Sequence, residues 1–205
     1  MPSAILVEGN YLHTMEKSNQ INHPILPLLE ARKSIRAFAP APVEQEKINS
    51  IFEAARWSFS ASNQQPWRFI YAHKNQPLWQ TIFDTLMDGN KPWNEHAPVL
   101  ILAMATKNMS NGNKYHHNLH DLGAATMAMN IQAVSLGLQL HPMAGFHKDK
   151  AIALLNIPDT LEPATLLSLG YPGNDFSALN EFQQKSETTR GERFLQEEFV
   201  FNNKL

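Results

Sequence analysis

The chain has 205 residues, of which 43% are hydrophobic and 18% are charged, and its formal net charge is −2. This length suits one domain with a sizeable core, and the near-neutral charge disfavours nucleic-acid binding. The absence of cysteine excludes disulfides, thiolate metal sites, iron–sulfur clusters and thiol nucleophiles. No window reaches about 18 uninterrupted apolar residues, and no signal peptide is recognisable. We therefore expect a cytoplasmic protein with no membrane span.

Residues 1–23 mix polar residues without a period, so we expect an N-terminal arm ahead of a single domain over residues 24–205. Apolar residues recur at helical spacing over residues 24–31 and again over residues 43–57, where acidic residues open the helix. A polar, proline-bearing stretch then leads into alternating aromatic and β-branched residues. This pattern predicts a loop followed by a strand over residues 67–73.

The middle of the chain predicts a helix over residues 76–87 and a turn at residues 88–90. A continuous apolar run over residues 98–106 favours a buried strand. The next predicted helix, residues 120–136, is rich in glycine and alanine, so another helix can approach it closely. Gly137 suits its C-terminal cap.

Four further segments follow in the C-terminal third. We expect a strand over residues 138–143, a helix over residues 148–155 and a strand over residues 164–169, with a strand-like segment at residues 199–201. Helices that alternate with four or five strands predict an α+β fold in which a sheet carries helices on its faces.

Three polar residues alternate after the first helix: Arg32, Ser34 and Arg36. In an extended segment their side chains share one face. Two guanidinium groups beside a hydroxyl suit a phosphate. The alternative is a solvated basic helix end.

Three histidines, His116, His117 and His120, lie next to Asp121. On a helix, the spacing of His116 and His120 would place two imidazoles on one face for a metal ion. A third and a fourth ligand are not evident in the sequence. We therefore favour the alternative, a polar helix start beside a pocket, and expect no metal site.

The common catalytic motifs are absent. The sequence has no G-x-S-x-G, H-E-x-x-H, P-loop or G-x-G-x-x-G motif, which disfavours serine hydrolases, zincins, P-loop NTPases and dinucleotide-binding Rossmann domains. A bound cofactor could supply the chemistry instead, so we assign no catalytic side chain.

Several motifs, in order and spacing, resemble the FMN-dependent nitroreductase family from about residue 25 to residue 200. They are A-R-K-S-I-R-A-F from Ala31, P-V-x-x-E from Pro42, S-A-x-N-x-Q-P-W-x-F from Ser60, G-N-x-x-W from Gly89, D-x-G-x-A from Asp121, G-L from Gly137, M-A-G-F from Met143 and L-G-Y-P-G from Leu169. The family usually has proline before the Ser–Ala pair, where this chain has Phe59. That departure bears on substrate preference more than on cofactor binding.

The resemblance implies a nitroreductase-like α+β fold with a central, mostly antiparallel sheet of four to five strands and helices on both faces. It also implies an intertwined homodimer in which residues 120–136 form the central helix. A C-terminal extension, about residues 180–205, would reach the partner subunit, where residues 199–201 would add a strand to its sheet.

The resemblance further implies FMN at the dimer interface, with NADH or NADPH as hydride donor. The phosphate would be held by Arg32, Lys33, Ser34 and, from the tail, Arg193 or alternatively Arg190. Arg36 would lie near the N1 and O2 edge of the flavin, where a cation stabilises the charge of the reduced ring.

The remaining expected FMN contacts fall on three segments. Asn90 would donate to the pyrimidine edge of the ring. The partner subunit would contribute the loop residues Ser60, Ala61, Ser62, Asn63 and Gln65. The segment Met143, Ala144 and Gly145 would pass close to the ring with a backbone N–H toward N5, as small residues permit. The candidate pocket-edge residues are Tyr115, His116 and Phe146.

The implied function is hydride transfer from NAD(P)H to an oxidised acceptor, such as a nitroaromatic or a quinone, by a ping-pong mechanism. One alternative is a flavoenzyme of the same fold with other chemistry, namely reductive dehalogenation, flavin fragmentation or azoline oxidation. Another is a flavin-binding protein without turnover. The sequence leaves the acceptor and the choice between NADH and NADPH open.

Overall fold

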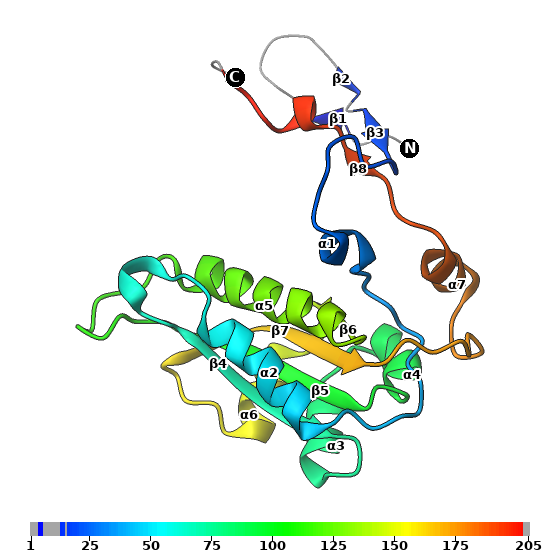
Figure 1. Cartoon of the computed structure of the whole chain (residues 1–205). Helices are drawn as coiled ribbons and strands as arrows, with labels where there is room; N and C mark the ends of the chain where they lie inside the picture. Colours follow the sequence, from blue (N-terminus) through cyan, green and yellow to red (C-terminus); the bar gives the residue numbers. More distant parts are fainter. Residues whose placement is uncertain (1–3, 6–12, 15, 203–205) are drawn as a thin grey trace.

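The centre of the fold is an antiparallel sheet of four strands (Figure 1). The computed structural model describes residues 4–5, 13–14 and 16–202. The strands are β4 (Trp67–His73), β5 (Val99–Thr106), β6 (Gln139–Met143) and β7 (Leu161–Gly170), in the order β4-β5-β7-β6. Every neighbouring pair is antiparallel, so the expected antiparallel sheet is confirmed, and β4 and β6 are its edges.

Helices cover both faces of this sheet, as expected (Figure 1). On one face lie α2 (Gln45–Arg56) and α5 (Asn118–Ser135), and on the other lie α3 (Pro77–Phe83) and α6 (Lys148–Leu155). Strand β5 is buried on both sides, because its alternate residues enter the two separate cores. Its continuous apolar run reflects this double burial.

Several predicted boundaries differ from the observed ones. Helix α1 (Pro27–Ala31) begins later than expected and has proline in its first turn, whereas α5 begins two residues earlier than the predicted residue 120. The turn at residues 88–90 is a 3-10 helix, η2 (Asp88–Asn90), which leads into the short helix α4 (Lys91–Asn94). Neither α4 nor α7 (Glu181–Thr188) was predicted, because both have a largely polar sequence without a clear apolar stripe.

Described segments near the two ends of the chain lie side by side, away from the sheet (Figure 1). Strand β3 (Lys17–Ser18) pairs antiparallel with β8 (Arg193–Phe194), and β1 (Ala4–Ile5) pairs with β2 (His13–Thr14). Strand β3 of the expected N-terminal arm therefore pairs with the C-terminal extension, a contact that sequence periodicity does not reveal.

Residues 199–201 form no strand within the described part of this single chain, and the strand that they would add to a partner subunit's sheet stays a prediction. The 3-10 helix η3 (Gln196–Glu198) precedes them, and Phe199, Val200 and Phe201 are 59%, 59% and 51% exposed without a strand assignment. A strand needs a neighbouring edge, and within the described residues of its own chain this segment pairs with none.

Within the described residues, no helix combines the length and the apolar character that crossing a membrane requires.

Candidate functional site

A small basic hollow lies where the segment after α1 meets the C-terminal extension. It has a volume of about 140 Å³. Its lining residues are Arg32, Lys33, Ser34, Ile35, Ser186, Thr189, Arg190, Gly191 and Arg193. Four cationic side chains and three hydroxyls thus surround one space, and no carboxylate is among the lining residues. This set of donors suits a phosphate group, and both Arg190 and Arg193 line the hollow.

The electrostatics of Arg32 reflect this crowding of cations. Burial, followed by the nearby charges of Arg193 and Arg190, lowers the pKa of the Arg32 guanidinium below its usual value. Its Nη1 donates to Ser34 Oγ at 3.4 Å. Since the cations repel one another, a bound anion would relieve the repulsion.

Arg36 does not line this hollow. Its Nη1 donates to Ser186 Oγ at 2.9 Å and lies 3.8 Å from Glu187 Oε1, while its backbone N–H donates to the same carboxylate oxygen at 3.0 Å. Of the three residues that the sequence grouped around a phosphate, Arg32 and Ser34 thus line the hollow and Arg36 does not. The reason is α7, which supplies both partners and was not predicted from the sequence.

The loop at residues 60–65 has an unusual backbone. Three residues other than glycine have positive φ: Ser62 at 50°, Asn63 at 52° and Gln65 at 48°. Each such residue costs on the order of 1–3 kcal/mol unless its surroundings hold it, and such residues cluster at binding sites. Ser60 Oγ accepts a hydrogen bond from the Gln65 backbone N–H at 3.0 Å, which closes the loop on itself.

Two buried side chains attach this loop to α5. Asp121 Oδ2 accepts from the Ala61 backbone N–H at 3.0 Å, and the Tyr115 hydroxyl lies 3.1 Å from the Ala61 carbonyl oxygen and contacts Asp121 Oδ2. Burial and the Asp121 carboxylate raise the pKa of Tyr115 to about 12. Burial raises the pKa of Asp121, but hydrogen bonds from Tyr115 and His120 outweigh it, so the pKa is lowered overall. Tyr115 is only 3% exposed, yet with His116 it lines a hollow of about 500 Å³, so both of these expected pocket-edge residues border a hollow.

Asn90 and the segment at residues 143–145 come together, although they are far apart in the sequence. Asn90 Nδ2 donates to the Gly145 carbonyl oxygen at 3.0 Å, and a Cβ on Gly145 would collide with that amide. Met143 points into the core and Ala144 is exposed, so only the backbone and small side chains border open space here. Phe146 is 2% exposed and belongs to the core, and it lines none of the three hollows of this chain described here.

The loop at residues 60–65 and the basic hollow lie at opposite ends of α5 in one chain (Figure 1). The loop at residues 60–65 is bound to Asp121 in the first turn of α5, whereas the Lys33 backbone N–H donates to Gln139 Oε1, beyond its last turn. A helix of 18 residues is about 27 Å long at 1.5 Å per residue. Within one chain the loop therefore does not meet the basic hollow.

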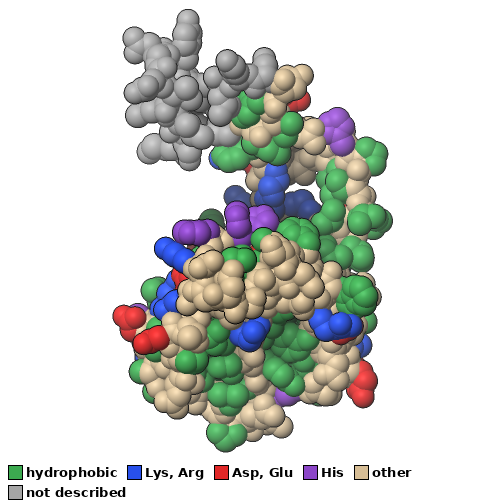
Figure 2. Space-filling model, turned by 90° about the vertical axis from the view of Figure 1, so that its left-hand side faces the viewer, with side chains coloured by type: hydrophobic (Ala, Val, Ile, Leu, Met, Phe, Trp, Pro, Cys, Tyr) green, Lys and Arg blue, Asp and Glu red, His purple; other side chains and the backbone are tan. Residues whose placement is uncertain are grey.

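The histidines lie on the loop end of the molecule. Figure 2 looks onto this end and shows histidine side chains grouped beside hydrophobic ones. The rings of Phe59 and His120 are 5.8 Å apart, those of His117 and His120 are 6.3 Å apart, and Phe59 is 66% exposed. Since α5 begins at Asn118, His116 lies outside the helix and cannot share a helical face with His120. The described residues contain no group of three potential metal ligands.

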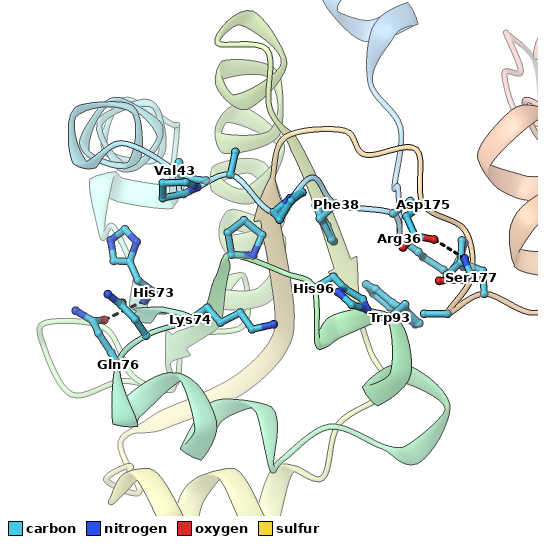
Figure 3. Close-up of a pocket in the computed structure, with 18 of the residues that line it drawn as sticks. Arg36, Phe38, Val43, His73, Lys74, Gln76, Trp93, His96, Asp175 and Ser177 are labelled. Atoms are coloured by element: carbon cyan, nitrogen blue, oxygen red, sulfur yellow. Dashed lines mark hydrogen bonds between the residues drawn. The ribbon is translucent and has the colours of Figure 1, made fainter.

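A larger hollow of about 890 Å³ lies elsewhere (Figure 3). It lies between the segment at residues 36–45, the turn after β4, the end of α4 and residues 175–179. Prolines and Phe38 form apolar walls, and His73, Lys74 and His96 border it. Among the expected FMN-binding residues only Arg36 lines it, so we do not assign it to the cofactor.

Sequence reasoning missed four residues around the segment after α1. Ser186, Glu187 and Thr189 belong to a polar run that carried no period, and His141 lies between apolar neighbours in a short strand. An unexplained polar residue in a buried strand is the one signal that could have identified His141.

Comparison with known proteins agrees with this arrangement. The model of the nitroreductase family matches residues 29–89 and 73–171, which together span most of the chain. The chain belongs to the nitroreductase family. The fold expected from the resemblance is thereby confirmed.

Three similar proteins illustrate the relation to other nitroreductase-family chains. A crystal structure described as an oxidoreductase containing FMN is 33% identical, has a TM-score of 0.84, and aligns over 93% of this chain and 98% of that chain. The FMN reductase [NAD(P)H] of Bacillus subtilis is 26% identical over 174 residues, or 73% of this chain and 66% of that protein. A protein of Archaeoglobus fulgidus, named as a proposed NADH dehydrogenase or NAD(P)H nitroreductase, is 26% identical over 156 residues, or 73% of this chain and 86% of that protein.

Proposed function

We propose that this nitroreductase-family chain is an FMN-dependent oxidoreductase. It takes hydride from NADH or NADPH and delivers it to an oxidised acceptor such as a nitroaromatic or a quinone. The two substrates occupy the same position in turn, which gives ping-pong kinetics. The relative that contains FMN and the relative named FMN reductase [NAD(P)H] support this proposal.

The basic hollow is the observation that carries the proposal. Its cations and hydroxyls, without a lining carboxylate, are the donor set that a ribityl phosphate requires. Arg32, Lys33 and Ser34 hold the phosphate from one side, and Arg190 and Arg193 hold it from the tail. When bound, FMN supplies the hydride-transferring ring that the side chains of this chain lack.

The side chains position groups and supply charge, and none acts as an acid or a base. Asn90 donates to the polar edge of the ring, while Gly145 lets the backbone approach it closely. Arg36 provides a fixed positive charge, since Ser186 and Glu187 hold its guanidinium in place.

The site is completed in a homodimer. Because the loop at residues 60–65 and the basic hollow lie at opposite ends of α5, a second chain must bring its loop to the flavin. The exposed side of α5 suits such a contact, since Leu119 and Met127 are 45% and 42% exposed and Gly123 leaves room between them. Truncation after Asn180 should therefore give a chain that neither binds FMN nor dimerises in sedimentation analysis.

The test is the visible spectrum of the purified protein, with identification of the extracted cofactor. We expect a yellow protein containing FMN, whose flavin bleaches rapidly when NADH or NADPH is added without oxygen. Substituting both Arg32→Ala and Ser34→Ala should abolish FMN occupancy, whereas Lys148→Ala, which removes an exposed cation on α6, should not change it. A colourless protein that FMN cannot reconstitute would refute the proposal. A yellow protein that NAD(P)H does not bleach would indicate flavin binding without turnover.

A further inference from the structure

The segment at residues 31–35 is held beside β6 by side chains. Strand β6 is an edge of the sheet. Gln139 accepts from the Lys33 backbone N–H at 2.9 Å and donates to the Ala31 carbonyl oxygen at 3.2 Å. His141, two residues further along β6, forms a 2.7 Å hydrogen bond through Nδ1 with the Ile35 carbonyl oxygen. The two side chains share one face of the strand and fix where the segment lies.

His141 makes the more demanding of these contacts. It is 7% exposed and its acceptor belongs to Ile35, which is also 7% exposed, whereas Gln139 is only partly buried. Water can replace the contacts of a partly exposed amide, but a buried carbonyl that loses its donor stays unpaired. The position of Ile35 therefore depends on His141 more than on Gln139.

The protonation state of His141 follows from its surroundings. Burial lowers its pKa to about 4, and the charges of Arg36 and Arg32 act in the same direction. At neutral pH the imidazole has a single N–H, and because a carbonyl only accepts, that hydrogen is on Nδ1. The neutral ring also stacks on Trp93, with centroids 4.8 Å apart and planes 25° apart.

Trp93 connects this histidine to Arg36. Arg36 directly follows Ile35 in the sequence, and its guanidinium carbon lies 5.8 Å from the centre of the Trp93 ring. Strand β6 continues into the segment at residues 143–145, where Asn90 contacts Gly145. Strand β6 thus holds residues 32–35, which line the basic hollow, and leads into residues 143–145, which Asn90 contacts.

We propose that His141 is a positioning residue for the cofactor site. By donating to the Ile35 carbonyl and stacking on Trp93, it fixes residues 32–36 relative to residues 143–145. This inference rests on the proposed function for its effect on FMN, but the clamp itself exists in the protein without cofactor. Nothing in this role requires His141 to touch a substrate.

Three substitutions separate the hydrogen bond from the stacking. His141→Asn keeps an N–H donor at the place of Nδ1, His141→Gln moves the amide toward the place of Nε2, and His141→Phe keeps the ring without a donor. The control is Asn130→Leu, which removes another buried side-chain bond to β6, from Asn130 Nδ2 to the Leu140 carbonyl at 3.2 Å.

Amide hydrogen exchange of residues 31–38, measured without cofactor, tests the clamp. We expect at least tenfold faster exchange in His141→Phe and His141→Gln, and rates within threefold of the original in His141→Asn and Asn130→Leu. Unchanged exchange in His141→Phe would overturn the proposal, and so would equally fast exchange in Asn130→Leu, because the effect would then be general destabilisation.

The FMN dissociation constant, measured by flavin fluorescence with the protein as titrant, tests the consequence. It should rise at least tenfold in His141→Phe and His141→Gln, and stay within threefold in His141→Asn and Asn130→Leu. Unaltered FMN affinity in His141→Phe, with the original protein binding FMN, would overturn the positioning role. If the original protein binds no FMN, the proposed function fails, and the exchange data still decide whether the clamp exists.

Discussion

The attachment of the loop at residues 60–65 to α5 predicts strong coupling between Tyr115 and Asp121. Tyr115→Phe removes a hydroxyl that contacts both the Asp121 carboxylate and the Ala61 carbonyl. Asp121→Ala removes the acceptor of the Ala61 N–H and of the Tyr115 hydroxyl, and both side chains are buried. Each mutation therefore leaves a polar group without its partner.

The expected magnitudes follow from the bonds that are lost. A hydrogen bond to a charged group contributes about 1.5–3 kcal/mol, so Tyr115→Phe should cost about 2 kcal/mol and Asp121→Ala about 4 kcal/mol of unfolding free energy. The double variant should cost about 4 kcal/mol, because the second mutation removes a group that the first has already left unpaired. The coupling energy is then about 2 kcal/mol. Asp121→Asn, which keeps an acceptor for Ala61, should cost only about 1 kcal/mol.

Urea unfolding monitored by circular dichroism and by tryptophan fluorescence measures all four variants, and coincidence of the two signals tests for a two-state transition. For a chain of this size, a loss of about 4 kcal/mol corresponds to a fall in Tm of about 8–16 °C. If the two single costs add to within about 0.5 kcal/mol in the double variant, the two residues do not act as one unit and the reasoning is refuted.

Three other predictions concern acid stability and the cofactor. The pKa of His141 is about 4 in the folded protein, against an ordinary value of 6.5. The unfolded chain therefore binds the proton more readily. As a result, about 3 kcal/mol of the unfolding free energy that is present above pH 6.5 is lost as the pH falls to 4. Urea midpoints at pH 7 and pH 4.5 should show this loss in the original protein and not in His141→Phe; an equal loss in both would contradict it. Gly145→Ala displaces the Asn90 amide and should weaken FMN binding at least tenfold, whereas Gly89→Ala, with open space around it, should bind FMN normally. Arg193→Ala should weaken FMN binding about tenfold and reduce its dependence on salt, with partial recovery in Arg193→Lys; equal affinity in all three proteins would remove Arg193 from the phosphate site.

The regular elements were largely predictable from local patterns. The apolar run of β5, the alternation in β4 and the helical spacing of α6 each lie within one short stretch of sequence, and all three elements were found where they were expected. Boundaries shifted where caps decide them, as at Pro27 and Asn118. Helix α7 was missed because a polar helix that packs on an extended segment has no periodic signal.

The sequence by itself determined the family, the cationic and hydroxyl residues of the segment after α1, and the polar loop at residues 60–65. It did so because motif order and residue chemistry can be read along the chain. Tertiary structure alone decided that Arg36 turns to α7, that Tyr115 is buried beside Asp121, and that His141 holds Ile35. The Ile35–His141 contact joins residues 106 positions apart and the Ala61–Asp121 contact joins residues 60 apart. Such contacts depend on how the sheet and helices pack, and no local pattern encodes them.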